Sequence, residues 1–136
     1  MPLLSRKGIL AIAAVLDVAI HGAERPVSAK MLAERQKLPP RHLEPLLQAL
    51  VRDGLLKGIR GPHGGYALGR DRSAITAEDI LRAAGRFEEA AEPRLPHSTL
   101  VSEVVTPALA AAERAFSQAL SSISIADMAD RATARS

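Results

Sequence analysis

The chain has 136 residues and a net charge of +3, and its 47% hydrophobic content is enough for one domain with its own core. It has no Trp, one Tyr and two Phe, which argues against a surface that stacks the bases of RNA or single-stranded DNA. Because it has no Cys, disulfides, thiolate zinc sites and cysteine-held iron–sulfur clusters are excluded.

The first predicted helix is capped by Ser5 and runs to about His21 and Gly22. Two apolar faces predict two packing partners for it. One face holds Ile9, Ile12, Ala13, Leu16 and Ala19, and the other holds Leu10, Val15 and Val18. Asp17 interrupts the apolar run, no signal-peptide cleavage site follows, and the run is shorter than the roughly 20 residues that cross a bilayer. We therefore expect a soluble cytoplasmic protein without membrane contact.

The second predicted helix is short, from Ala29 to Gln36, and Ser28 caps it. Met31 and Leu32 are expected to face inward. The polar side chains of Lys30, Glu34 and Arg35 are expected to stay outside.

The third predicted helix begins near Pro40, because proline is favoured at the first helical position, and it runs to Asp53. Its first turn carries Arg41 and His42, and Pro45 falls early enough to be tolerated. Its apolar stripe consists of Leu43, Leu46, Leu47, Leu50 and Val51.

A glycine-rich turn with the sequence R-G-P-H-G-G-Y, residues 60–66, follows between two strand-like segments, residues 55–59 and 66–68. Gly61, Gly64 and Gly65 permit positive φ values at the tip of a tight hairpin. Arg60 and His63 on such a rigid tip suit the minor groove of duplex DNA, although the loop alone is also typical of an ordinary surface hairpin. A short helix, a turn, a longer helix and then a hairpin is the order of a winged helix-turn-helix.

The charge is divided in the same way as these elements. The first 72 residues hold twelve Lys or Arg and six Asp or Glu, net +6, whereas the remainder holds six and nine, net −3. This asymmetry favours a nucleic-acid-binding half joined to a separate interaction half.

A fourth helix is predicted to open at Thr76, with acidic residues in its first turn, and to end at Gly85. Ile80, Leu81 and Ala84 are expected to face inward. A polar loop over residues 88–98 is expected to follow.

A long helix is predicted after that loop, with a stripe of apolar residues at alternating spacings of four and three. The stripe consists of Val105, Leu109, Ala112, Phe116, Ala119 and Ile123. A single helix cannot bury such a stripe, so it pairs with a second copy or packs on its own domain. Pro107 either kinks this helix or marks its first turn with Thr106 as the cap. A short helix over residues 124–131 could pack against a partner.

These elements predict a mainly α fold: a winged helix-turn-helix DNA-binding domain with a small β-hairpin wing, residues 1–85, a loop over residues 86–99, and a long dimerisation helix with a short terminal helix, residues 100–136.

Short segments along the chain add a more specific pattern. They are residues 5–8, Leu43 with Glu44, residues 54–56 leading into R-G-P-x-G-G-Y, Ile75 and Thr76 with Asp79 and Ile80, and residues 120–122 with Ala126 and Asp127. With these segments the chain resembles the Rrf2 family of bacterial regulators over nearly its full length. The resemblance implies a homodimer that places one winged helix on each half of a pseudo-palindromic operator in double-stranded DNA.

The resemblance also implies roles for individual residues. Base-contacting positions of the family correspond to Arg41 and His42, its wing arginine corresponds to Arg60, and its DNA-backbone contacts correspond to Ser5 and Lys7. Members that bind an iron–sulfur cluster use three cysteines in a segment matching roughly residues 88–98, and this chain has none there. Pro45 replaces a side chain that is usually polar in the family, so the operator sequence cannot be taken from relatives.

The candidate DNA-binding set is completed by four residues on the same elements, namely Ser28, Glu44, Lys57 and His63. Arg41 could bind a guanine edge or a phosphate, and Glu44 could accept from cytosine N4 or pair with Arg41. Lys57 is either a phosphate contact or solvated.

Catalysis and metal binding have little support in the sequence. The chain has no nucleophile elbow, triad motif or phosphate-binding glycine loop, so it is not expected to be an enzyme. The four histidines, His21, His42, His63 and His97, are scattered without ligand spacing, so neither a metal nor another cofactor is expected. His97 is the histidine best placed to respond to pH or a ligand, although a solvated loop histidine is the more common case.

The favoured hypothesis is a dimeric, cluster-free transcriptional regulator that acts as a repressor, with an unknown small-molecule effector left open. We expect any effect of an inducer in residues 88–98. The alternative hypothesis is a protein-interaction adaptor of the same fold that regulates a partner enzyme without binding DNA.

Overall fold

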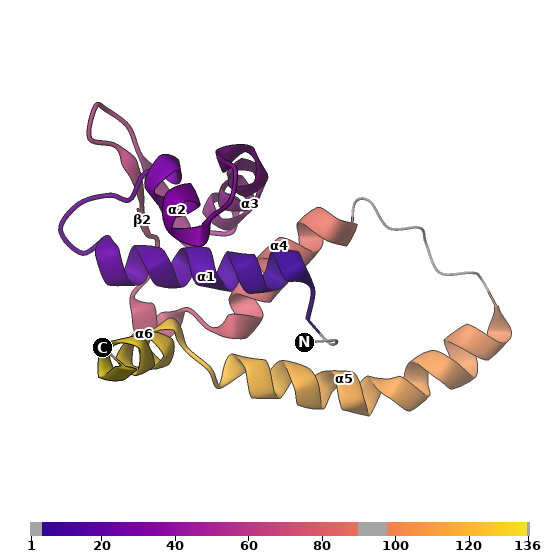
Figure 1. Ribbon diagram of the computed structural model, residues 1–136. Coiled ribbons are helices and arrows are strands. Elements are labelled where there is room, and N and C mark those ends of the chain that lie inside the picture. Colours follow the sequence, from indigo (N-terminus) through magenta and orange to yellow (C-terminus); the bar gives the residue numbers. More distant parts are fainter. Residues whose placement is uncertain (1–3, 90–97, 136) are drawn as a thin grey trace.

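The computed structural model describes residues 4–89 and 98–135. Its elements follow in the order α1 (Arg6–His21), α2 (Ala29–Gln36), α3 (Pro40–Arg52), β1 (Leu56–Ile59), β2 (Gly65–Leu68), the 3₁₀ turn η1 (Arg72–Ala74), α4 (Ala77–Glu89), the π-helical turn η2 (Val101–Val105), α5 (Thr106–Ser121) and α6 (Ile125–Arg135). Helix α1 runs through the middle of the molecule, with α2, α3 and the hairpin on one side and α5 and α6 on the other (Figure 1). Helices α2 and α3, with the hairpin, form the predicted winged helix-turn-helix.

Three predicted helix starts are confirmed, each by a local signal. The Ser5 hydroxyl accepts from the Gly8 N–H at 3.0 Å, and the Ser28 hydroxyl accepts from the Met31 N–H at 3.1 Å. Pro40 takes the first position of α3, and the helix continues through Pro45 to Arg52. The tight connection between α2 and α3 is made by Lys37, which has a left-handed φ of 57°.

The wing is a two-stranded antiparallel hairpin in which Leu56 pairs with Leu68 and Ile59 pairs with Gly65. A third segment joins it, because Val27 forms an isolated bridge with Tyr66 through two backbone hydrogen bonds of 2.8 and 2.7 Å. Sequence reasoning missed this bridge, which spans 39 positions of the chain. It requires a glycine at position 65, where a Cβ atom would lie 2.5 Å from the Val27 oxygen. At the tip Gly61 has the predicted positive φ, whereas Gly64 does not.

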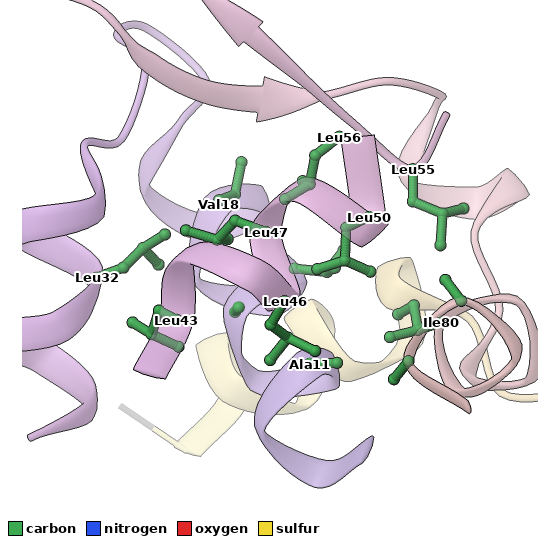
Figure 2. Packing of buried hydrophobic residues seen from close by; sticks show 14 of the residues in the cluster. Ala11, Val18, Leu32, Leu43, Leu46, Leu47, Leu50, Leu55, Leu56 and Ile80 are labelled. Carbon is green, nitrogen blue, oxygen red and sulfur yellow. The ribbon is translucent and has the colours of Figure 1, made fainter. Parts of the chain in front are cut away.

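One hydrophobic core joins α1, α2, α3 and α4, and Figure 2 shows its leucines converging from several of these elements. Leu43, Leu46, Leu47 and Leu50 of the predicted α3 stripe are buried. Three residues that we expected to face inward, Ile9, Met31 and Val51, are exposed instead. Each lies beside a surface groove rather than under another element. On α1 the buried face is displaced from the predicted one, because Ala11 and Ala14 are buried whereas Ile9 is exposed and Ile12, Ala13 and Leu16 are half-buried.

A buried ion pair fixes α2 onto α1. Asp17 is only 6% exposed, and both of its carboxylate oxygens accept from the Arg35 guanidinium at 2.7 to 3.1 Å. This hydrogen bonding to Asp17 raises the pKa of Arg35 above its ordinary value. Arg35 stays outside as predicted, with 32% of its side chain exposed, but its guanidinium also satisfies a carboxylate that burial would otherwise penalise, a contact that the sequence did not predict.

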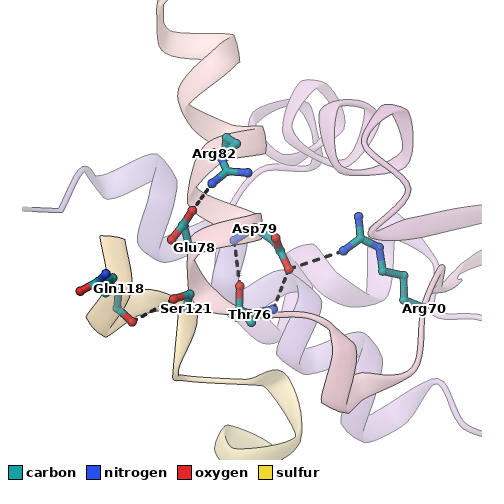
Figure 3. Close-up of polar contacts among 7 residues, drawn as sticks. All are labelled: Arg70, Thr76, Glu78, Asp79, Arg82, Gln118 and Ser121. Carbon is teal, nitrogen blue, oxygen red and sulfur yellow. Dashed lines mark hydrogen bonds and ion pairs between the residues drawn. The ribbon is translucent and has the colours of Figure 1, made fainter. Parts of the chain in front are cut away.

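Helix α4 begins as predicted but ends later. Thr76 and Asp79 form a reciprocal cap, with the Thr76 N–H donating to Asp79 Oδ2 and the Asp79 N–H donating to Thr76 Oγ1, both at 3.1 Å (Figure 3). Gly85 does not end the helix, since it is not among the glycines with a positive φ and α4 continues to Glu89. Of the predicted polar loop, residues 88 and 89 belong to α4, and residues 90–97, including His97, lie outside the described residues.

The long helix begins after Ser98, whose hydroxyl accepts from the Val101 N–H at 3.1 Å. Pro107 lies in the first turn of α5, as one of the two predictions for it had it, but Thr106 is not the cap. The residue ahead of the helix is Val105, which makes no side-chain hydrogen bond and belongs to the π-helical turn η2. A π turn changes the hydrogen-bond spacing at the point where proline cannot donate.

The sequence allowed packing of α6 on a partner, and within the single chain α6 packs on α1 and η1. Ile125 and Ala129 are buried against α1 and η1. Two backbone hydrogen bonds of 2.8 Å, from Ala77 N–H to the Ile123 oxygen and from Ile125 N–H to the Ile75 oxygen, tie the start of α6 to the start of α4.

Candidate nucleic-acid interface

The first turns of α1 and α3 carry an unusual charge. Arg6 and Lys7 occupy the first two positions of α1, Arg41 and His42 follow Pro40 in α3, and neither turn contains an acid. All four side chains are exposed. The N-terminal end of a helix is the positive end of its dipole, so cations placed there are repelled rather than stabilised. The arrangement leaves a surplus of positive charge that an external anion would neutralise.

The two helix ends lie next to each other. Arg6 and Lys7 line the same surface groove as Arg41 and His42, although 34 positions separate Lys7 from Arg41. Helix α3 adds few backbone donors here, because Pro39 and Pro40 have no N–H and the His42 N–H donates to the Pro39 oxygen at 3.0 Å. The side chains of the groove are therefore its main means of binding an anion.

The wing supplies a second basic group. Arg60 and His63 are exposed at the hairpin tip, and Lys57 is exposed on β1. His63 lines a groove together with Ser28 and Met31, so the wing tip lies beside the start of α2. Arg60 faces a different groove, which it shares with Val51, Ile59 and Tyr66.

Two sets of the predicted DNA-binding residues come together. Lys7, Arg41 and His42 meet at the ends of α1 and α3, and Ser28 and His63 meet beside the wing, whereas Arg60 and Ser5 line other grooves. Ser5 and Ser28 both use their hydroxyls as caps. Glu44 is exposed, and within the described residues no ion pair joins it to Arg41, so that alternative reading of Glu44 is not supported. The contacts of these residues with DNA stay predictions.

The predicted set left out Arg6, which is exposed beside Lys7 in the first turn of α1. It also left out Arg70 and Arg82, which form a second basic group around a polar hollow at the opposite end of α3 together with Arg52, a residue that the sequence offers as a phosphate contact or a solvated side chain. Arg70 pairs there with Asp79 at 3.5 Å, and Arg82 pairs with Glu78 (Figure 3). These partners neutralise much of its charge, so this group is a weaker anion site than the α1–α3 end.

The stripe on α5 is uncovered in the single chain. Leu109 is 60% exposed, and Val105, Ala112, Phe116, Ala119 and Ile123 are exposed as well. Helix α5 contacts α4, and Phe116 of the stripe lines a groove there with Leu81 and Gly85 of α4, so the stripe is exposed but not wholly turned away from its own chain. Such a contiguous apolar strip is typical of a protein interface.

The donor set does not fit a cysteine-held cluster. The chain contains no Cys, and within residues 4–89 and 98–135 no three His, Asp or Glu side chains gather as metal ligands would. In the same ranges, none of the helices combines the length and apolar character that a membrane span requires.

Known proteins similar to this chain are transcriptional regulators. The Rrf2 family model, described as "Iron-dependent Transcriptional regulator", matches residues 4–131. The HTH-type transcriptional regulator IscR of Photorhabdus laumondii is 40% identical over 87 residues, which are 64% of this chain and 53% of that protein. The chain thus matches about half the length of such relatives.

Solved structures show the same fold. IscR of T. potens superposes with a TM-score of 0.72 at 36% identity, covering 95% of this chain and 87% of that one. CymR of B. subtilis, titled the global cysteine regulator of that organism, superposes with a TM-score of 0.74 at 29% identity, covering 94% and 96%. These relatives are regulators rather than enzymes, as the sequence predicted for this chain.

Proposed function

The chain belongs to the Rrf2 family of transcriptional regulators, and on that premise we propose that it is a homodimeric, sequence-specific DNA-binding repressor that carries no iron–sulfur cluster. The cytoplasm, where bacterial DNA lies, is its expected location. The observation that carries the proposal is the surplus of positive charge on the adjacent N-terminal ends of α1 and α3.

The arrangement of the elements suits a duplex. A major groove admits an α-helix, and the exposed first turn of α3 would present Arg41 and His42 to base edges. Lys7, from the first turn of α1, would then contact the phosphate backbone. The wing, with Arg60 at its tip, would reach an adjacent minor groove.

The stripe on α5 supports a second copy as partner. Two antiparallel α5 helices that exchange this stripe would bury side chains that are now exposed, including Leu109 and Phe116. A two-fold dimer would place two α3 helices on the two halves of a pseudo-palindromic site.

Missing thiolates distinguish this chain from regulators that hold a cluster through cysteines. We propose that it responds to another signal, such as a small molecule.

DNA binding is tested by titrating fluorescent duplex from the upstream region of its own gene, with unrelated duplex as competitor. We expect a complex that survives the competitor and that Arg41→Ala and Arg60→Ala weaken by on the order of tenfold each. Arg131→Ala serves as the matched control, because Arg131 is an exposed arginine on α6. Equal affinity for both duplexes, there and in a random-sequence pool, would contradict the proposal and favour the adaptor.

Dimer formation is tested by sedimentation of Leu109→Glu beside Ala111→Glu, an exposed position outside the stripe. Burial of a leucine contributes about 1.5–3 kcal/mol, so Leu109→Glu should raise the dissociation constant of the dimer at least about tenfold. Because Leu109 is exposed in the single chain, the fold should survive. A monomeric wild-type protein would remove dimerisation from the proposal.

A further inference from the structure

The groove between the first turns of α1 and α3 has a second property besides its charge. Its volume is about 780 Å³, within the roughly 300–1,000 Å³ of pockets that hold small organic molecules. The residues that line it are Arg6, Lys7, Ile9, Leu10, Leu38, Arg41, His42 and Pro45.

The floor of the groove is apolar. It consists of Ile9, Leu10, Leu38 and Pro45, which come from α1, from the connection between α2 and α3, and from α3. Ile9 is 41% exposed although it lies on a helix that is otherwise well buried. Covering this floor with an apolar ligand would stabilise it by about 25 cal/mol per Å² of surface removed from water.

The rim of the groove is basic. Arg6, Lys7, Arg41 and His42 are the charged or titratable side chains among the residues that line it, and none of those residues is acidic. The positive ends of two helix dipoles add to this charge. Binding a phosphate needs only the rim, whereas an apolar floor inside a basic rim matches a ligand that has both an anionic head and an apolar tail.

We propose that this groove binds a small amphipathic anion, with an apolar chain on Ile9, Leu10, Leu38 and Pro45 and a carboxylate or sulfonate held by Arg6 and Arg41. Lys7, Arg41 and His42 are also the residues that we assign to DNA. The ligand and the operator therefore compete for the same surface, a consequence that rests on the proposed function. The groove would then be the effector site of a regulator without a metal cofactor.

The test is calorimetric titration of the full-length protein with decanoate, below the concentration at which it forms micelles. Acetate, which has the head group without the tail, and decyltrimethylammonium, which has the same tail with the opposite charge, are the ligand controls. We expect decanoate to bind stoichiometrically and the two controls to bind at least about tenfold more weakly.

The variants separate the floor from the rim. Ile9→Ser removes apolar surface from the floor, and one methylene in an apolar pocket contributes about 1–3 kcal/mol. The substitution should therefore weaken decanoate binding by on the order of tenfold or more. Arg6→Gln should weaken it by removing a charge from the rim. Ile59→Ser is the matched control, since Ile59 is 40% exposed but lies on β1 beside a different groove, and it should leave the affinity unchanged.

Three results would overturn the proposal: no binding of decanoate, equal binding of decyltrimethylammonium, or an equal loss in Ile59→Ser. Sedimentation of Ile9→Ser can give a fourth such result. If this substitution changes the oligomeric state and the wild-type protein does not bind decanoate, the groove is an interface with a second copy of the chain. Displacement of duplex by decanoate is measured separately. If the protein binds no duplex at all, the proposed function fails while the calorimetric result for the groove still stands.

Discussion

The helix ends on the two halves of this molecule carry charges of opposite sign. At the starts of α1 and α3, Arg6, Lys7, Arg41 and His42 oppose the helix dipole. At the starts of α4 and α6, Asp79 and Asp127 accept from the backbone N–H groups of Thr76 and Ser124 at 3.1 and 3.2 Å and complement the dipole. The caps of the second pair stabilise the fold, whereas the first turns of α1 and α3 contain no acid that would complement the dipole.

The two acid-capped ends also support each other. Thr76 and Ser124 form an isolated β-bridge, so the caps of α4 and α6 are joined through their backbones. The basic ends of α1 and α3 instead meet at an open groove. This difference indicates which charges hold the fold together and which are available to a ligand.

The largest expected effect comes from removing Arg35, a cation of the basic half that stabilises the fold. Arg35→Ala would leave the buried Asp17 carboxylate without its main partner and should lower the free energy of unfolding by about 3 kcal/mol. Arg82→Ala, which breaks the exposed pair with Glu78, should change it by less than about 1 kcal/mol. Urea unfolding of both variants measures this. Equal losses of unfolding free energy in the two variants would mean that burial of the acidic partner does not decide whether a cation stabilises the fold.

A charge reversal at the start of α3 should move stability and DNA affinity in opposite directions. Arg41→Glu places an acid at the positive end of the helix dipole and should stabilise the fold by roughly 0.5 kcal/mol. It should weaken DNA binding by on the order of a hundredfold, equivalent to about 2.7 kcal/mol. Thermal unfolding and anisotropy titration are read together, and a variant that loses both would show that Arg41 supports the fold.

Removal of a cap on the other half should lower stability and leave DNA affinity unchanged. Thr76→Ala deletes the hydroxyl that accepts from the Asp79 N–H and should destabilise the protein by about 1 kcal/mol. Affinity for DNA should stay at the wild-type value, because Thr76 caps α4 and does not line the basic groove. A marked loss of DNA affinity in a folded variant would break the comparison between the two kinds of helix end.

The smallest effect is expected from the acid cap of η1. Asp71 accepts from the Ser73 hydroxyl and from the Ser73 N–H, and these hydrogen bonds lower its pKa below the ordinary value. The stabilisation is present above the unfolded pKa of about 3.9 and is lost as pH falls through the lower folded value. Melting temperatures of the wild type and Asp71→Asn should therefore differ slightly at neutral pH and converge in acid. A constant difference would assign the effect of the substitution to something other than ionisation.

Helix starts were predictable because their signals are local. Ser5, Ser28, Pro40 and Thr76 each act on backbone groups within a few residues, and each marks an observed helix start. The hairpin was predictable for the same reason, since its glycines and its strands are adjacent in the chain.

Features that depend on distant segments were not predictable. Asp17 binds Arg35 of the next helix, and Val27 pairs with Tyr66 of the wing. The residues next to Asp17 and Val27 in the sequence do not indicate these partners. Ile9 was expected to be buried because its spacing fits a helical face, yet no described segment covers it. Arg41 and His42 were proposed as DNA contacts from the family resemblance and their place in the first turn of α3, whereas the groove that they share with Arg6 and Ile9 emerged only from the fold.

The most direct test of the central claim is the salt dependence of DNA binding for the wild type and Lys7→Gln. The claim is that the basic ends of α1 and α3 bind DNA phosphates. The slope of log affinity against log salt concentration should fall in magnitude by about 0.9 for each phosphate contact that is lost. If Lys7→Gln keeps its fold and its slope is smaller in magnitude by about 0.9, the loss of one phosphate contact, the result would agree with the claim. A slope equal to that of the wild type would contradict it.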